Sequence, residues 1–210
     1  MRILYPPSPR LKIHPTELKG YESSGKWVAQ YKLNGTRNLV HVLPNGQVEL
    51  FTRHGTPHKR FSLSESLRKE ILSLNIQTGL EYWLDGELLD AKTVTPAYKH
   101  RIVLFDILFS GKYLFGVDQL SRLDLLRKIC GNPCTLEPNL GLALQVTENL
   151  WMLETWEEGF VQHYERLLAQ PEIEGLVLRQ KISRLDTVGT RQYDAAWILR
   201  CRKPSRLYMF

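Results

Sequence analysis

The sequence predicts an α+β fold of mainly antiparallel sheets flanked by helices. Segments with strand periodicity outnumber segments with helical periodicity, and one pair of strand segments is joined by an Asn-Gly turn. The helical segments fall between groups of strands, whereas a parallel sheet requires strands and helices in strict alternation. These observations favour hairpins and helices packed on sheets.

The first strands are predicted in the N-terminal quarter. Residues 1–20 are rich in proline and basic residues, and we expect them to be extended. Residues 26–33 alternate as a strand. The alternation places one set of side chains on one face (Val28, Gln30 and Lys32) and the other set opposite (Trp27, Ala29 and Tyr31). Residues 38–43 and 47–53 form a predicted hairpin around Asn45-Gly46.

The middle of the chain predicts a helix and two strands. The segment from Ser62 to Glu65 resembles a capping box and opens a helix with apolar residues at helical spacing. These residues are Leu63, Leu67, Ile71 and Leu74. Residues 81–90 and 101–109 are apolar, β-prone segments and are predicted strands.

The second half predicts two further helices and two strands. Asp118 or Ser121 caps a helix that ends before Gly131, with Leu120, Leu123 and Leu126 turned inward. Residues 148–169 are expected to form one long helix, with Leu153, Trp156, Phe160 and Leu167 on one side. Strands are predicted at 173–180 and 194–202. Because no composition break marks a linker, residues 1–210 are expected to form a single domain.

Composition narrows the class of protein. The chain has 210 residues, a formal net charge of +6 and a pI of about 9.2, a balance common among proteins that bind polyanions. No apolar run approaches the roughly 18 residues of a membrane span, and the N-terminus carries no secretion signal. We expect no membrane partner and a cytoplasmic location, or a nucleoid-associated or viral replication context.

Six short segments carry residues suited to chemistry. They are KLNGTR at 32–37, FTRHG at 51–55, LDGELLD at 84–90, IVLFDILF at 102–109, EGLVLR at 174–179 and WILRCRK at 197–203. Taken singly, each is explained by an ordinary turn, a strand or a solvated basic segment. Their order and spacing along the chain are more specific than any one of them.

In this order the six segments resemble the signature motifs of the covalent nucleotidyltransferase superfamily, which comprises ATP-dependent DNA ligases, RNA ligases and mRNA capping guanylyltransferases. The segment LSRLDLLRKI at 120–129 is similar to the Arg-x-x-Leu-Leu helix of ligases. The resemblance spans residues 26–203 and implies a ligase-type adenylation domain. No C-terminal oligonucleotide-binding (OB) barrel is expected, because the chain ends seven residues after Lys203; the alternative is a partner that supplies an OB-type domain.

The resemblance implies ATP and Mg²⁺ (or Mn²⁺) as cofactors and a role for each matched residue. Lys32 would be the nucleophile that forms a phosphoramidate with AMP. Arg37 and Arg53 would bind phosphate or ribose oxygens, and Phe105 would stack on the purine. Glu87 would accept from the ribose or help Glu174 hold the metal. The remaining cofactor-binding residues would be Gln30, toward the adenine amino group, and Arg179, Arg200 and Arg202, toward the phosphates.

The sequence departs from the family at several of these positions. Asn34 stands where Asp is usual in the first motif, Gln30 stands where many ligases carry Glu, and Arg179, Arg200 and Arg202 stand where Lys is usual. Strand parity places Glu174 and Arg179 on opposite faces of one regular strand. The interpretation therefore requires the strand to begin after Gly175.

The leading hypothesis is an ATP-dependent polynucleotide ligase. It would transfer AMP from Lys32 to a 5′-phosphate and join that end to a 3′-hydroxyl, acting as a monomer on nicked or broken ends. DNA is slightly favoured over RNA or mixed ends, because LDGELLD and LFDIL are closer to the DNA ligases. The alternatives are an RNA ligase, a GTP-using capping-type guanylyltransferase, and a non-catalytic module that binds nucleic-acid ends.

Overall fold

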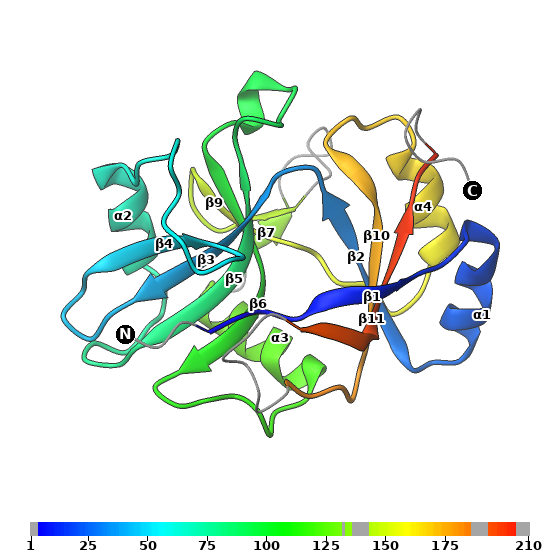
Figure 1. Ribbon diagram of the computed structural model, residues 1–210, viewed down its shortest axis with the longest axis horizontal. Helices are drawn as coiled ribbons and strands as arrows, with labels where there is room; N and C mark the ends of the chain where they lie inside the picture. Colours follow the sequence, from blue (N-terminus) through cyan, green and yellow to red (C-terminus); the bar gives the residue numbers. More distant parts are fainter. Residues whose placement is uncertain (1–3, 132, 136–142, 186–192, 205–210) are drawn as a thin grey trace.

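The structure is a computed structural model that describes residues 4–131, 133–135, 143–185 and 193–204. It contains two sheets, shown in Figure 1. The four-stranded sheet has the order β1-β11-β10-β2, and the seven-stranded sheet has the order β4-β3-β5-β6-β9-β8-β7. The pairs β1/β11 and β6/β9 are parallel and the other pairs are antiparallel, so the predicted α+β class with mainly antiparallel sheets is confirmed.

The strands and helices have the following bounds. The four-stranded sheet consists of β1 (Ser8–Lys12), β11 (Asp194–Arg202), β10 (Ile173–Gln180) and β2 (Trp27–Leu33). The seven-stranded sheet consists of β3 (Thr36–Val42), β4 (Val48–Thr52), β5 (Tyr82–Leu89), β6 (Arg101–Ser110), β7 (Cys134–Thr135), β8 (Leu144–Gln145) and β9 (Leu150–Met152). The helices are α1 (Leu18–Ser23), α2 (Glu65–Leu72), α3 (Gln119–Ile129) and α4 (Phe160–Leu167), with 3₁₀ turns η1 (Pro15–Glu17) and η2 (Pro96–Tyr98).

Local sequence signals account for the elements that were predicted correctly. The β3–β4 hairpin turns at Asn45-Gly46, where Gly46 has a φ of 77°, a conformation that glycine adopts without strain. Helix α3 is capped by Asp118, whose carboxylate accepts from the backbone N–H of Ser121 at 2.9 Å. Gly131 follows α3 with a φ of 72°. Both helix ends are therefore where the sequence places them.

The predicted long helix over 148–169 is wrong. Its first part forms β9, which pairs in parallel with β6, and the chain becomes helical only at Phe160. Gly159 precedes the helix with a φ of 74°, and the Glu22 carboxylate accepts from the backbone N–H groups of Gly159 and Phe160. The helical spacing of Leu153 and Trp156 was therefore accidental, because pairing with a distant strand decided the local structure.

Two smaller predictions also need correction. Residues 1–20 are not extended throughout, since β1 is followed by η1 and by the start of α1. The helix cap is Ser64, whose hydroxyl accepts from the backbone N–H of Leu67 at 3.1 Å, and not Ser62. The capping box proposed for residues 62–65 was thus placed two residues too early.

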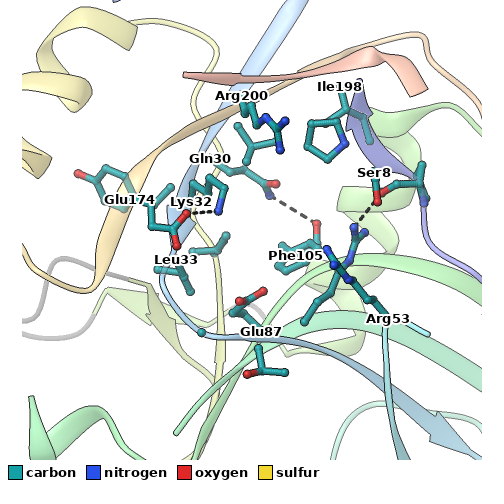
Figure 2. Close-up of a pocket in the computed structure, with 18 of the residues that line it drawn as sticks. Ser8, Gln30, Lys32, Leu33, Arg53, Glu87, Phe105, Glu174, Ile198 and Arg200 are labelled. Atoms are coloured by element: carbon teal, nitrogen blue, oxygen red, sulfur yellow. Dashed lines mark hydrogen bonds and ion pairs between the residues drawn. The ribbon is translucent and has the colours of Figure 1, made fainter. Parts of the chain in front are cut away.

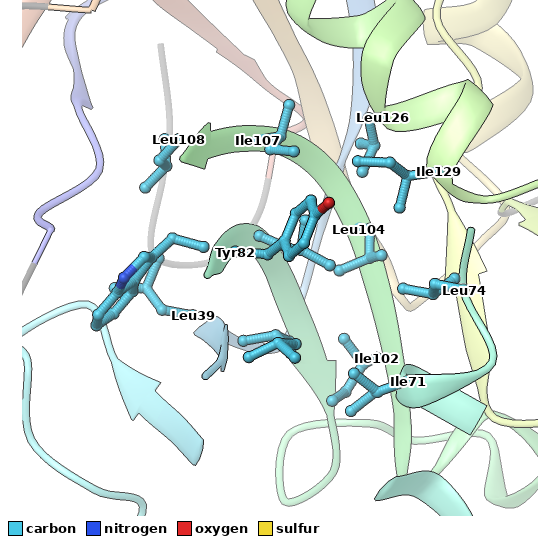
Figure 3. Packing of buried hydrophobic residues seen from close by; sticks show 14 of the residues in the cluster. Leu39, Ile71, Leu74, Tyr82, Ile102, Leu104, Ile107, Leu108, Leu126 and Ile129 are labelled. Carbon is cyan, nitrogen blue, oxygen red and sulfur yellow. The ribbon is translucent and has the colours of Figure 1, made fainter. Parts of the chain in front are cut away.

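The buried apolar residues form two clusters, and the second one joins the two sheets. The first packs α2 and α3 against one face of the seven-stranded sheet, where Ile71, Leu104 and Leu126 meet (Figure 3). The second lies under α1 and α4 and contains Val103 and Phe105 of β6 together with Leu176 of β10 and Leu199 of β11. Among the described residues, no helix has the length and apolarity that crossing a bilayer requires.

Candidate functional site

A cavity of about 730 Å³ is lined by residues of both sheets. Residues of β1, β2, β5, β6, β10 and β11 contribute to its walls. All of the predicted site residues line it: Gln30, Lys32, Arg37, Arg53, Glu87, Phe105, Glu174, Arg179, Arg200 and Arg202. Figure 2 shows side chains from these separate motifs converging on one space. Folding thus brings together residues that lie far apart in the sequence.

Strand β2 delivers Lys32 to the cavity. Its alternate residues Ala29, Tyr31 and Leu33 are buried in the apolar cluster. Gln30 and Lys32 lie on the other face of the strand, as the alternation predicts, and line the cavity. The Lys32 amine forms an ion pair with the carboxylate of Glu174, and both side chains are partly exposed. The amine is therefore reachable from the cavity and held in a defined position.

A β-bulge in β10 delivers Glu174. The pairing of β10 with β2 shifts register between Ile173, opposite Leu33, and Gly175, opposite Lys32. Glu174 is the extra residue, so it faces the cavity together with Arg179 although regular parity would separate them. The expectation that the strand begins after Gly175 is thus wrong, because the strand begins at Ile173 and a bulge solves the parity problem.

Glycine is required at the bulge. A Cβ on Gly175 would lie 1.9 Å from the backbone oxygen of Cys201 and 2.7 Å from Cα of Arg202. The close approach of β10 and β11 also brings the Arg202 guanidinium to within 3.4 Å of the Glu174 carboxylate. Glu174 is consequently shared between the amine of Lys32 and Arg202.

The turn after β2 is fixed against β5. A Cβ on Gly35 would lie 2.6 Å from the backbone oxygen of Leu88 and 2.7 Å from Cγ of Glu87. The backbone oxygen of Gly35 accepts from Lys92 Nζ at 2.8 Å, and the backbone N–H of Asn34 donates to the oxygen of Glu172 at 2.7 Å. These contacts hold Lys32 and Glu87 on neighbouring walls of the cavity.

Glu87 is the acidic residue whose ionisation is most perturbed in the cavity. Burial raises the pKa of its carboxyl to about 7, although Lys32, Arg37 and Lys92 favour the charged form. Glu87 therefore changes charge close to neutral pH. A metal ion or a ribose hydroxyl would meet either the acid or the carboxylate, depending on pH.

Arg37 lines the cavity but is largely engaged by the protein. Its Nε donates to Asp85 at 2.9 Å, a second N–H pairs with the other carboxylate oxygen, and NH1 donates to the backbone oxygen of Pro7 at 2.8 Å. The contact between Arg37 and phosphate or ribose stays a prediction, and the bidentate face of the guanidinium is turned to Asp85. Only the N–H groups that remain could reach a ligand.

A buried network that sequence analysis missed lies behind the cavity. Asp106 is fully buried and accepts from Arg122 Nε at 3.0 Å and from Arg122 NH2 at 3.2 Å. Burial opposes ionisation of Asp106, but Arg122 and then Arg179 outweigh it and hold its pKa below the ordinary value. Arg179 is also buried, with its NH1 3.6 Å from Asp106, and burial lowers the pKa of its guanidinium. The signal for this network was a charged residue flanked by apolar ones, both in LFDIL and in the apolar stripe of α3.

Three predicted residues face the cavity in different ways. The Nε of Arg200 is buried without a hydrogen-bond partner among the described residues, and Figure 2 shows the side chain pointing into the cavity. Arg53 is exposed at the rim, where its Nε donates to His54 at 3.1 Å. Phe105 is nearly buried, with the guanidinium carbons of Arg37 and Arg179 at 5.5 and 5.3 Å from its ring centre. Its ring is thus already in contact with two cations.

Other cavity residues had no sequence signal. Pro7, Ser8, Pro9 and Arg10 form part of the wall because β1 pairs with β11, and Lys92 lies on the loop after β5. Among the residues that the structure describes, no cluster of three or more His, Cys, Asp or Glu is arranged to hold a metal ion. Glu87 and Glu174 are the carboxylates that the resemblance assigns to a metal.

No protein family's sequence profile matches the chain, and no curated protein sequence matches it. Solved structures do match. A mycobacterial DNA ligase D complexed with ATP and MES superposes with a TM-score of 0.64 at 19% identity over 95% of this chain. The ligase domain of LigD from M. tuberculosis gives a TM-score of 0.63 at 19% identity over 95% of this chain. Lig E DNA ligase gives a TM-score of 0.53 at 15% identity over 95% of this chain.

The match covers only part of the larger proteins. The chain spans 60% and 59% of the two mycobacterial chains and 70% of the Lig E chain. At these identities the likeness concerns the fold. The chain has the nucleotidyltransferase-domain fold of the ATP-dependent DNA ligases.

Proposed function

We propose that the chain is the catalytic core of an ATP-dependent polynucleotide ligase and that residues 1–210 form one nucleotidyltransferase domain. The observation that carries the proposal is the amine of Lys32, partly exposed in a cationic cavity and paired with Glu174, on a ligase fold. A lysine amine held beside several arginines is suited to attack a phosphate.

The reaction has three steps. The neutral amine of Lys32 attacks the α-phosphorus of ATP, so that an N–P bond forms, the bond to the bridging oxygen breaks, pyrophosphate leaves, and the nitrogen loses a proton to solvent. A 5′-phosphate oxygen of the nucleic acid then attacks the same phosphorus, the N–P bond breaks, and the nitrogen of Lys32 takes up a proton from solvent. A 3′-hydroxyl finally attacks the 5′-phosphorus, loses its proton, forms the phosphodiester and releases AMP. The ammonium of Lys32 that pairs with Glu174 must lose a proton before the first step, because an ammonium has no lone pair to attack with.

The residues present suit ATP and a divalent metal. The buried Nε of Arg200 is a donor that a phosphate oxygen would satisfy, and Arg202 and Arg53 add positive charge to the same cavity. Mg²⁺ is usually held by one or two carboxylates together with substrate phosphates and water, which Glu174 and Glu87 would supply from the protein side. The metal would neutralise phosphate charge during attack.

The nucleic-acid substrate is proposed to be nicked or broken DNA, with RNA or mixed ends second. The net charge of +6 favours a polyanionic partner. Lig E, which binds DNA with a minimal scaffold, covers 95% of this chain in the comparison. If lysine adenylation proves slow, we propose that an OB-type domain supplied by a partner completes the enzyme.

Intact mass after incubation with ATP or GTP and Mg²⁺ tests the proposal. Wild type is expected to gain the mass of one AMP with ATP and none with GTP, and Lys32→Ala is expected to gain nothing. Lys32→Arg keeps the charge beside Glu174 and is expected to fold but to remain unlabelled. A GMP adduct would favour the capping-type alternative.

A second assay separates an inactive first step from a non-catalytic protein. The Arg37 and Arg179 side chains are engaged by buried carboxylates, which is the specific observation that favours the end-binding alternative. Sealing of a pre-adenylated nick by wild type would establish the ligase even without an adduct. Binding of the nick with neither an adduct nor sealing would contradict the proposal.

A further inference from the structure

The two ends of the Gln30 amide can be told apart by their partners. Its Oε1 accepts from Arg179 Nε at 3.1 Å. Its Nε2 donates to Thr155 Oγ1 at 2.9 Å and, more weakly, to the backbone oxygen of Phe105 at 3.5 Å. An arginine N–H can only donate and a backbone oxygen can only accept, so exchanging the two ends would lose both contacts.

The partners of Gln30 are themselves fixed. Arg179 is 4% exposed and lies beside Asp106, which Arg122 holds from helix α3. Thr155 lies in the segment between β9 and α4, where the neighbouring Trp156 forms backbone hydrogen bonds with Ala29 of β2. The orientation of the amide is therefore imposed by several elements and does not depend on one flexible contact.

The hydrogen bonds of Gln30 within the protein leave one of its acceptor sites unused. A glutamine amide has two N–H donors and a carbonyl oxygen with two lone pairs. Both donors of Gln30 are directed at Thr155 and Phe105, whereas one lone pair of Oε1 remains after Arg179. Toward the cavity that it lines, Gln30 can therefore accept a hydrogen bond but cannot donate one.

We propose that Arg179 is a positioning residue that sets the nucleobase preference of the cavity, by locking Gln30 so that it accepts from an exocyclic amino group. A 6-aminopurine would satisfy this acceptor, whereas a 6-oxopurine would place two acceptors face to face. Thr155 does not take part in this choice, because a hydroxyl can either accept from Nε2 or donate to Oε1. The inference rests on the proposed function, since the place of Gln30 beside the base comes from the ligase resemblance.

The proposal explains why a lock is needed at this position. A carboxylate accepts at either end and has no wrong orientation, but an amide that turns over presents a donor instead. Gln30 and Arg179 both depart from the usual ligase residues, and in the structure they contact each other. The two departures therefore form one unit, in which the arginine selects the accepting end of the amide.

Equilibrium binding of ATP and ITP to the full chain tests the lock, because ITP differs in carrying the 6-oxo group. Wild type is expected to bind ATP about tenfold or more tightly than ITP, the effect of one unsatisfied buried polar group. Arg179→Met keeps an unbranched side chain but removes the donor to Oε1, so the ATP/ITP ratio is expected to fall at least about threefold. Arg179→Lys keeps a donor and is expected to keep the ratio, and Thr155→Val is expected to keep it too, because the Thr155 hydroxyl does not distinguish the two ends of the amide.

The same test in the Gln30→Glu variant separates an effect on the orientation of the amide from general damage to the site. In Gln30→Glu the carboxylate accepts at both ends, so adding Arg179→Met is expected to leave the ATP/ITP ratio unchanged. A merely structural role for Arg179 would weaken the binding of both nucleotides equally, with Gln30 or with Glu at position 30. Urea unfolding of each variant shows whether it remains folded under the binding conditions.

The outcomes separate this inference from the proposed function. An AMP adduct on Lys32 together with equal binding of ATP and ITP would overturn the lock and leave the ligase proposal standing. A ratio that Arg179→Met does not change would also overturn it. If neither ATP nor ITP binds, both the lock and the proposed function are overturned.

Discussion

At the scale of single residues, the cavity is defined by how its charges are paired. The Glu174 carboxylate forms ion pairs with both Lys32 and Arg202, and the Asp85 carboxylate forms one with Arg37. The cations thus differ in availability: Arg200 has a buried donor without a hydrogen-bond partner among the described residues, and Arg37 is engaged at two points. Substitution of Arg200 is therefore expected to weaken nucleotide binding directly, whereas substitution of Arg37 would first disturb the fold around Asp85.

Glu87 gives the protein a predictable pH dependence. Its pKa is about 7 in the folded chain and 4.5 ordinarily, so the folded state holds more protons between these values. By linkage, this residue's contribution to the free energy of unfolding falls as pH rises from about 4.5 to 7 and is constant above. Glu87→Gln removes that loss, so it is expected to be more stable than wild type at pH 8 by on the order of 2 kcal/mol.

Urea unfolding at several pH values measures this effect. The quantity to compare is the difference between wild type and Glu87→Gln at each pH, because the other titrating groups then cancel. The difference is expected to grow between pH 4.5 and 7. A difference that is independent of pH would show that Glu87 titrates normally.

Arg122 is expected to be essential to stability. It is fully buried and supplies two hydrogen bonds to the buried carboxylate of Asp106. Arg122→Leu leaves that charge without its main partner and is expected to lower the free energy of unfolding by about 3–5 kcal/mol. Arg127→Leu on the exposed side of α3 is the matched control and is expected to change it by less than about 0.5 kcal/mol.

A double variant identifies the cause of that loss. If unpaired charge on Asp106 is responsible, adding Asp106→Asn to Arg122→Leu should recover part of the stability, as urea unfolding would show. Equal stability of the single and double variants would assign the loss to packing alone.

The sequence predicts part of the site, because the order of the motifs indicates which side chains lie together in the cavity. The partners of those side chains were not visible. Gln30 and Arg37 were predicted to contact the nucleotide directly, yet their hydrogen bonds run largely to Arg179, Thr155 and Asp85. Such pairings depend on rotamers and on strands that are distant in the sequence, which neither spacing nor parity encodes.

At the scale of elements, the bulge in β10 is the feature on which the site depends most. Gly175→Ala would place a Cβ 1.9 Å from the backbone oxygen of Cys201, so β10 and β11 would have to separate. We expect a loss of about 3 kcal/mol or more and a displacement of Glu174 from Lys32. Urea unfolding and intact-mass labelling with ATP measure the two effects.

The matched control is Gly20→Ala in helix α1, where a Cβ would meet no atom within 4 Å. It is expected to be neutral or to stabilise by about 0.5–1 kcal/mol. If both alanine variants behave alike, the contact at Gly175 is not what holds the bulge.

The elements that the sequence predicted well are those with local signals. Alternation marked β2, an apolar β-prone segment marked β5, and Asp118 and Gly131 marked the ends of α3. The prediction for the segment around β9 failed because this strand is stabilised by pairing with β6, whereas the helical spacing of Leu153 and Trp156 indicated a helix. The bulge at Glu174 was also invisible as such, although the parity conflict at that residue indicated that a regular strand was wrong.

At the scale of the whole molecule, the two sheets share an apolar cluster. Val103 and Phe105 of one sheet pack with Leu176 and Leu199 of the other. We therefore expect the chain to unfold in one cooperative transition, with far-UV circular dichroism and tryptophan fluorescence giving the same urea midpoint. Added ATP is expected to raise both midpoints equally, whereas separate midpoints would indicate two domains.

The parallel pairing of β1 with β11 has a consequence for how the protein is made. Ser8, Pro9 and Arg10 of β1 line the same cavity as Ile198, Arg200 and Arg202 of β11, although they come from the first and the last strands described. During synthesis β1 emerges early and has no partner until β11 has left the ribosome. Contacts between such distant segments form late in folding. A nascent chain should therefore be unable to complete this cavity, or to retain ATP in it, until β11 has left the ribosome.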